Sequence, residues 1–395
     1  MSEFPWHLGV YDAHCHPTDT MSSIPDIPNM KAKALTIMAT RGDDQRLVSE
    51  VTEKFGGEGR VDDGNLRSNC RVVPSYGWHP WFSHQIYDDA EYEGSTCLNT
   101  QQKVQHYQSV LNPKPEDEAF VTALPDPEPL SQLLDRTRAY LERDPSALLG
   151  EVGLDKSFRL PEAWFPDDHQ RDGSLTPGGR EGRKLSLYRV SMEHQRRLLK
   201  AQLGLAGRLG RAASVHGVQA HGVLYETFKE TWKGHERKHI SKREKKRQTR
   251  DQIVLDTVGD DDRNLSEDAR GSPSDVPAGK PFPPRVCLHS YSGNPQSISP
   301  YLHPSVPIDF FFSFSAAINF SMRESSKTED AIRAVPDGRL LVESDLHTAG
   351  NRMDDHLEQI VRIVCKCKGW ELEQGIERLG RNWQQFVFGS DESEP

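Results

Sequence analysis

The sequence predicts an α/β fold in which eight parallel strands close into a TIM-type (β/α)8 barrel. Short apolar or β-branched runs alternate along the chain with polar loops and helix-like stretches, and this order is typical of βαβ units with parallel pairing. Eight such runs occur, and eight strands fit a closed barrel better than an open sheet. The length of 395 residues allows one large domain, so we expect a single barrel over residues 1–390.

Each expected strand is a short apolar run that leads into a polar loop and then into a helical pattern. The expected strands cover residues 8–14, 34–39, 71–77, 147–153, 212–217, 285–290, 308–314 and 340–345. The helix-like stretches between them cover residues 43–55, 184–207, 218–233, 323–335 and 351–368.

Two segments interrupt the alternation and are expected to be insertions in barrel loops. Residues 111–129 are rich in proline and acidic residues and are expected to form a loop. Residues 233–283 are a low-complexity, charged segment with few large apolar residues, so we expect it to be disordered. Its basic start, 233–250, has three interpretations: a solvated charged helix, a nuclear-localisation-type patch, or a contact to a phosphate backbone.

The overall composition narrows the class of protein. A net charge of −10 excludes a molecule built throughout to bind nucleic acid, so any such surface must be local. Six cysteines without a CxxC pair argue against a disulfide scaffold and a structural zinc knuckle. The N-terminus does not resemble a signal peptide, and no run of eighteen apolar residues occurs. We therefore expect a cytoplasmic or nuclear protein that does not span a membrane.

Side chains that can bind a metal gather where the predicted strands end, which is where (β/α)8 barrels carry their chemistry. In the stretch YDAHCHPT, His14 and His16 are two residues apart, so on a strand they share one face, with Asp12 on the same side. The other candidates follow later strands and are His79, Glu151, His216, His289, Glu343 and Asp345.

Each of these residues also has a structural explanation when it is taken alone. A single histidine at a strand end is more often a hydrogen-bonded loop anchor than a ligand, and Glu151 can cap a turn or pair with a lysine. Their joint occurrence favours a metal centre, because several uncompensated ionisable groups would otherwise be buried together. Nitrogen and oxygen donors without a thiolate suit Zn, Mn or Fe, or Mg where carboxylates dominate. Cys15 should point the opposite way from its neighbours.

The same residues resemble the TatD-like metal-dependent hydrolases, a branch of the amidohydrolase-type barrels whose characterised members are DNases. Several motifs of this family occur in order from residue 8 to about 388, and motifs in this order are very specific. The matching segments are DAHCHP, YGWHPW, LLGEVGLD, SVH, CLHSYSG, LLVESD and LGRNWQQFVF. The resemblance implies the TIM-type barrel of these hydrolases, with the two insertions placed in its loops.

The resemblance also implies a site for two divalent ions, of Mg, Mn or Zn. One ion would be held by His14, His16, Glu151 and Asp345, and the other by the bridging Glu151 with His216 and His289. Glu151 and Asp345 would be the catalytic residues, with Asp345 orienting a water and taking its proton.

The resemblance further implies that substrate is contacted from the loop that holds His79, Trp78 and Trp81. Aromatic rings there are plausible stacking surfaces for splayed bases. The equally weighted alternative is that these rings only fill the mouth of the barrel.

The chain departs from the family pattern at three points. The segment HGVQAHG that begins at His216 lacks the cation that the family places there, and SDLHTAG lacks a proline and carries His347 instead. Trp81 stands where the family pattern has a histidine. Since the ligand residues are intact and the residues around them have changed, we expect either an altered substrate or a protein whose main work is binding.

Three functions follow from these observations. The first is a metal-dependent deoxyribonuclease or phosphodiesterase, acting on DNA or another phosphodiester. The second is an adaptor, because members of the fungal branch with the ESDLH form are similar to a protein that binds a tetratricopeptide-repeat subunit of the anaphase-promoting complex. The third is a small-molecule amidohydrolase, which is disfavoured because that group commonly has a carboxylated lysine where this chain has Glu151.

Overall fold

The central element is a parallel sheet of eight strands. The computed structural model describes residues 3–56, 70–162, 175–176, 183–238, 279–321 and 325–389. Every hydrogen-bonded pair of neighbours in the sheet is parallel. In their order across the sheet, the strands are β1 (Tyr11–Cys15), β2 (Ala34–Met38), β3 (Arg71–Tyr76), β7 (Leu148–Asp155), β9 (Ala213–Val218), β10 (Arg285–Leu288), β11 (Asp309–Ser315) and β12 (Leu340–Glu343).

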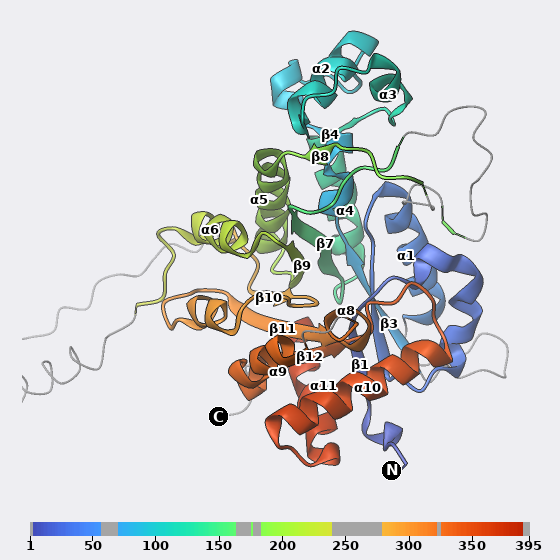
Figure 1. Cartoon of the computed structure of the whole chain (residues 1–395), viewed down its shortest axis with the longest axis vertical. Helices are drawn as coiled ribbons and strands as arrows, with labels where there is room; N and C mark the ends of the chain where they lie inside the picture. Colours follow the sequence, from blue (N-terminus) through green and yellow to red (C-terminus); the bar gives the residue numbers. More distant parts are fainter. Residues whose placement is uncertain are drawn as a thin grey trace, which may run out of the picture.

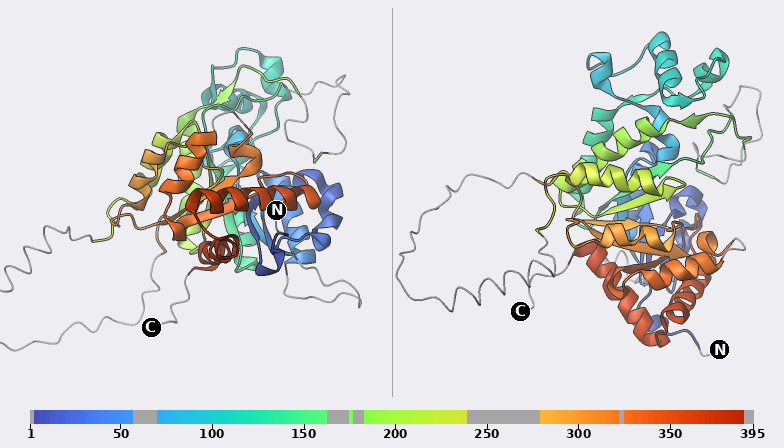
Figure 2. Two further views of the ribbon diagram at one scale, coloured as in Figure 1. Left: turned by 60° about the horizontal axis from the view of Figure 1, so that its bottom comes forward. Right: turned by 60° about the vertical axis from the view of Figure 1, so that its left-hand side comes forward.

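The two edges of this sheet approach each other, so that the sheet is nearly closed into a barrel (Figures 1 and 2). Backbone hydrogen bonds join the ends of β1 and β12. Asp345 N donates to His14 O at 3.0 Å, and His16 N donates to Leu346 O at 2.8 Å. The predicted (β/α)8 barrel and its eight strands are therefore confirmed. The hydrogen bonds that close the barrel join the carboxyl ends of β1 and β12.

Helices cover the outside of the sheet (Figure 2). They are amphipathic: α10 (Asn351–Lys368), for example, buries Met353, Leu357 and Val361 against the barrel at no more than 1% exposure. Burial of each such side chain contributes about 1.5–3 kcal/mol. The helices that follow barrel strands are α1 (Gly42–Phe55), α4 (Leu130–Arg143), α5 (Met192–Arg208), α6 (His221–Trp232), α8 (Ala316–Asn319), α9 (Ser325–Ala334), α10 (Asn351–Lys368) and α11 (Leu372–Phe388). The described 3-10 turns are Trp6–Leu8, Pro17–Asn29, Pro80–Gln85, Asp89–Tyr92, Pro295–Ser297, Ser299–Leu302 and Asp337–Arg339.

A small lobe stands on one end of the barrel (Figure 1). Its elements are α2 (Thr100–Val110), α3 (Glu118–Ala123) and the strand pairs β4 (Ile86–Tyr87) with β6 (Glu128–Pro129) and β5 (Leu111–Asn112) with β8 (Arg189–Val190). The expectation of a plain loop over residues 111–129 needs correction, because α3 lies within it. Asp117 caps α3, and Phe120 and Leu124 pack into an apolar cluster of the lobe with Tyr107. The many proline and acidic residues of this segment led to the prediction of a loop, although it also contains the apolar residues that pack in the lobe.

The predicted charged insertion, 233–283, lies mostly outside the described residues, so its disorder stays a prediction. The helix expected from residue 184 begins at Met192 instead, because Ser191 caps it and Arg189–Val190 form a strand. None of the helices in the described ranges has both the length and the apolar composition needed to cross a bilayer.

Candidate metal centre

Glu151 lies at the centre of the barrel mouth, where histidines from several strands surround it. One of its carboxylate oxygens, Oε2, faces the pair from β1 and its following residue: His14 Nε2 is 3.4 Å away and His16 Nε2 is 3.2 Å away. These two ring nitrogens are 3.0 Å apart. Asp345 joins the same group, with its Oδ1 3.6 Å from His16 Nε2 and 4.0 Å from His14 Nε2. The first predicted ligand set is therefore brought together.

The other oxygen of Glu151, Oε1, faces a different set of histidines. His289 Nε2 is 2.8 Å from it, and His216 Nδ1 and His79 Nε2 are each 3.0 Å from it. His216 and His289 also approach each other, at 3.2 Å between Nδ1 and Nε2. One buried carboxylate, 3% exposed, thus directs its two oxygens at two separate groups of nitrogen donors.

The local backbone explains why Glu151 points into the barrel. The pairing of β7 with β9 shifts register between Leu149 and Val152, which is a bulge around Glu151. Two residues later the strands approach closely at Gly153, whose φ is +151°. A Cβ atom at Gly153 would lie 2.1 Å from the backbone oxygen of His216, so only glycine allows this approach.

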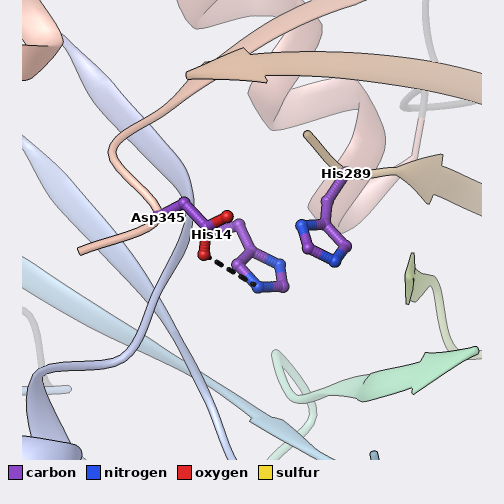
Figure 3. Close-up of side chains that lie close together, drawn as sticks. All are labelled: His14, His289 and Asp345. Carbon is purple, nitrogen blue, oxygen red and sulfur yellow. Dashed lines mark ion pairs between the residues drawn. The ribbon is translucent and has the colours of Figure 1, made fainter. Parts of the chain in front are cut away.

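Figure 3 shows how three of these side chains meet. The rings of His14 and His289 are stacked, with centroids 3.8 Å apart and planes 4° apart, and the Asp345 carboxylate lies beside them. Within the described part of the chain, three groups of His, Glu and Asp have ligand atoms that all lie within 4.8 Å of one another. They are His14, His289 and Asp345; His14, His16 and Glu151; and His79, Glu151 and His216.

The far nitrogens of His14 and His216 contact groups that can accept a hydrogen bond. His14 Nδ1 lies 2.9 Å from Ser214 Oγ, and His216 Nε2 lies 3.1 Å from Asp155 Oδ2. A far nitrogen that donates its proton to an acceptor leaves a lone pair on the near nitrogen, and this is the tautomer that binds a metal. His289 Nδ1 lies 3.8 Å from Glu343 Oε1, which is too far for a hydrogen bond, so the tautomer of His289 is not fixed in this way.

His79 differs from the other histidines around Glu151. Its Nδ1 accepts a hydrogen bond from the backbone N–H of Trp81 at 3.2 Å, so this nitrogen carries no proton. Burial lowers the pKa of His79 to about 4, so at neutral pH the ring is neutral and its one proton sits on Nε2. His79 therefore donates to Glu151 Oε1 and is built as a hydrogen-bond donor rather than a metal ligand.

The charges of the site are arranged around Glu151. Burial opposes ionisation of Glu151, but His79 and His289 hold its pKa well below the usual value. Burial also disfavours a charged His16, yet Glu151 raises the pKa of His16 to about 9. For His14 burial dominates and, helped by the neighbouring His289, lowers the pKa to about 3. The cluster therefore keeps its carboxylate ionised and has neutral and cationic nitrogen groups around it.

Asp345 is held in place by a partly buried network of hydrogen bonds. Its φ is +53°, and the neighbouring Ser290 also has a positive φ, of +40°. The Ser290 hydroxyl lies 3.0 Å from Asp345 Oδ2 and 2.6 Å from Glu343 Oε1, and Ser290 N donates to the same Glu343 oxygen at 2.7 Å. Such strained, over-determined backbone is typical of functional sites.

A cavity of about 640 Å³ opens above these residues. It is lined by His16, His79, Glu151, His216, His289 and Asp345, together with Trp81. Trp78, predicted to contact substrate, is not brought there: it is 4% exposed, donates from Nε1 to Phe82 O at 2.9 Å and packs in the cluster with Ile86 and Leu133. For Trp78 the filling role is the one that the structure supports.

Three residues near the cavity had no role in the sequence analysis. Asp155 accepts from both His216 and Trp81, and its signal was a carboxylate at the end of the β7 strand motif. Asp19 Oδ2 lies 2.8 Å from Nδ1 of His347, and both line the cavity. Arg41 lines it as well, after β2, and no motif indicated it.

Comparisons with known proteins find similar sequences along nearly the whole chain. A family model described as TatD related DNase matches residues 11–387. The Cut9-interacting protein scn1 of Schizosaccharomyces pombe is 35% identical over 378 residues, covering 96% of this chain and 98% of the relative. An uncharacterized deoxyribonuclease of Saccharomyces cerevisiae is 23% identical over 395 residues, covering 95% of this chain and 98% of that relative.

Solved structures with low sequence identity share the fold. An uncharacterized amidohydrolase from Saccharomyces cerevisiae matches with a TM-score of 0.54 at 14% identity, covering 96% of this chain and 99% of that one. A hydrolase of the TatD family from Entamoeba histolytica matches with a TM-score of 0.50 at 10% identity, covering 97% of this chain and 99% of that one. At these identities the likeness supports the barrel architecture and nothing finer.

Proposed function

Since the chain belongs to the family of TatD-related DNases, we propose that it is a divalent-metal-dependent hydrolase that cleaves phosphodiester bonds, with DNA as the expected substrate. The observation that carries the proposal is the position of Glu151. Its two oxygens face two separate groups of nitrogen donors, as a carboxylate that bridges two ions requires.

The donor set fits two divalent ions of the Mg, Mn or Zn type. His14, His16, Glu151 and Asp345 would hold one ion, and Glu151, His216 and His289 would hold the other. The hydrogen bonds of His14 to Ser214 and of His216 to Asp155 favour the tautomers that such ligands need. When bound, paired ions lower the pKa of a water and neutralise charge on the phosphoryl oxygens.

The protein's own groups would place the substrate and move the proton. Asp345, fixed by Ser290 at 3.0 Å, is the group that orients the attacking water and accepts its proton. His79 presents a proton on Nε2 that is oriented before substrate arrives, because the N–H of Trp81 occupies its other nitrogen. This proton is directed at Glu151 Oε1, 3.0 Å away, so His79 holds the bridging carboxylate in place, and a contact of His79 with substrate would require the ring to leave this partner.

The activity is tested by nucleotide release from 3′-labelled single-stranded DNA with added Mg²⁺ or Mn²⁺. We expect release by the wild-type protein and a loss of at least about 100-fold in Asp345→Asn, with activity retained in Asp135→Asn, whose side chain is exposed and remote from the site. Folded, metal-loaded wild-type protein that releases nothing would contradict the proposal.

A second candidate function is the binding of a partner protein, because one relative is named for its interaction with Cut9. We propose that such a partner is a tetratricopeptide-repeat subunit of the anaphase-promoting complex, and that the protein binds it in the nucleus or cytoplasm. Co-purification with the Cut9 homologue from the same cells tests this. Binding that persists in Asp345→Asn would separate the adaptor role from the hydrolase role, and an absence of binding by wild-type protein would remove this candidate.

A further inference from the structure

The walls of the cavity above the candidate metal centre are mainly apolar. Five apolar or aromatic side chains line it, from the last residue of β9 and from the segments that follow β3, β7 and β11: Trp81, Phe82, Leu175, Val218 and Ile318. Ile318, on α8, is 48% exposed, although large apolar side chains in the described part of the chain are mostly buried. Exposed apolar surface at the rim of a cavity is typical of ligand-binding sites.

Lysine and arginine side chains are scarce along the same walls. Among the described residues that line the cavity, Arg41 is the single lysine or arginine. Its guanidinium is 2.9 Å from Asp44 Oδ2 and 3.9 Å from Asp19 Oδ1, so carboxylates already offset its charge. Proteins that follow a nucleic-acid backbone neutralise several phosphates with lysine and arginine, and the described walls do not offer such a track.

One aromatic wall residue is held rigidly before any ligand arrives. Trp81 donates from Nε1 to Asp155 Oδ2 at 2.7 Å. Its ring is stacked on Phe158, with centroids 4.5 Å apart and planes 10° apart. An aromatic surface fixed in this way binds a flat group without losing side-chain entropy.

Ile318, at the rim of the cavity, is also held in place before a ligand arrives, because hydrogen bonds fix the short helix α8 that carries it. Asn319, the next residue, accepts from Ser315 N at 2.8 Å and donates to Tyr291 O at 3.2 Å. Both ends of the short helix are therefore tied to the barrel, and Ile318 keeps its place above the site.

We propose that this cavity recognises an aryl or similarly flat, apolar group on the part of the substrate that stays on the scissile phosphorus when the leaving group departs, and that it engages one phosphate rather than a run of phosphates. The inference rests on the proposed phosphodiesterase function and names its substrate class. Trp81 and Ile318 are the residues that determine this specificity.

The test compares two small substrates that share the leaving group 4-nitrophenolate. One carries phenyl and the other methyl as the group that remains on phosphorus, and the ratio of their kcat/KM values is divided by the ratio of their rates with hydroxide. We expect phenyl to be preferred by about 10- to 100-fold, the range that burial of a large apolar side chain supplies. A corrected ratio near one would overturn the inference.

Variants show which residues cause the preference for the phenyl substrate. Ile318→Ser should lower the corrected ratio several-fold, whereas Val223→Ser, a change at an exposed apolar residue outside this cavity, should leave it unaltered. An unaltered ratio in Ile318→Ser would remove Ile318 from the proposal. Cleavage of DNA with no cleavage of the phenyl diester would overturn this inference alone, and failure to cleave any diester would overturn the proposed function with it.

Salt dependence gives an independent measurement on a natural polymer. A site that engages one phosphate of single-stranded DNA should lose only about 3-fold in kcat/KM between 50 and 200 mM salt, because one released counterion gives a slope of about −0.7. A loss of more than about 100-fold would indicate that five or more phosphates are neutralised, and would contradict the single-phosphate part of the inference.

Discussion

Asp155 holds His216 through a single carboxylate oxygen, with 3.1 Å between Asp155 Oδ2 and His216 Nε2. The same oxygen accepts from Trp81 Nε1 at 2.7 Å. Asp155 thus fixes both a proposed metal ligand and an aromatic wall of the cavity. The orientation of the ligand and the shape of the substrate site are therefore set by one buried group.

Asp155→Asn should weaken the binding of the second ion by about 10- to 100-fold, because an amide cannot accept at both of its positions. Oδ1 of Asp155 accepts from Ser157 N and Phe158 N, so either orientation of the amide loses acceptors. Calorimetric titration with Mn²⁺ measures this, with Asp135→Asn as the matched control. Equal affinities in the wild type and Asp155→Asn would show that His216 does not need this partner.

Replacing His14 and His16 together by alanine should remove at least one ion from the purified protein. The Nε2 atoms of His14 and His16 lie within 3.4 Å of Glu151 Oε2, so the double substitution removes both histidine ligands proposed for the ion on this side of Glu151. Elemental analysis of metal content checks this, and His235→Ala, at an exposed position away from the site, should keep the full content. Unchanged metal in the double variant would contradict the assigned ligand set.

Gly153→Ala should lower the free energy of unfolding by about 2–4 kcal/mol, because the added Cβ meets the backbone of His216 at 2.1 Å and the residue has a positive φ. Gly222→Ala is the control, since no atom outside its chain neighbours and the backbone of its own helix lies within 4 Å of its added Cβ. Urea unfolding compares the two variants. We also expect the metal content of Gly153→Ala to fall, and equal stability of the two variants would show that β7 and β9 can separate freely.

Three buried histidines outside the metal centre should make stability depend on pH. Burial lowers the pKa of His84 to about 3 and those of His106 and His194 to about 4, and the Nε2 atoms of the latter two lie 2.7 and 2.8 Å from backbone carbonyl oxygens. The unfolded chain binds protons near pH 6.5 and the folded chain does not. Stability is therefore full above pH 6.5 and is lost as the pH falls towards 4.

The effect of one of these histidines is measured by urea unfolding between pH 4.5 and 7.5. Below pH 6.5, His84→Gln should reduce the dependence of the unfolding free energy on pH by about 1.4 kcal/mol per pH unit, the equivalent of one proton. His235→Gln, at an exposed position, should leave the slope as it is in the wild type. A slope in His84→Gln equal to that of the wild type would mean that His84 titrates alike in both states.

The barrel and its strands could be predicted from the sequence because the signals are local. Runs such as residues 34–39 and 147–153 become β2 and β7 almost as expected, since a parallel strand buried on both faces needs a continuous apolar run. The strand-end rule then places His14, Glu151, His216, His289 and Asp345 at one mouth, where the structure brings them together.

Features that depend on contacts between distant segments could not be predicted. The tautomer of His79 is set by one backbone N–H, and the role of Asp155 by its contact with His216, which is 61 residues away in the chain. Trp78 and Trp81 have the same residue type in one loop, yet one is buried in a cluster and the other lines the cavity. Residue type and spacing do not distinguish these cases.

The most direct test of the two-ion site is anomalous diffraction at the manganese edge from crystals soaked in Mn²⁺. We predict two peaks about 3.5–4 Å apart, one among His14, His16, Glu151 and Asp345 and one among Glu151, His216 and His289, with no contact to His79. A single peak, a peak bound by His79 Nε2, or no peak at Glu151 would contradict the account.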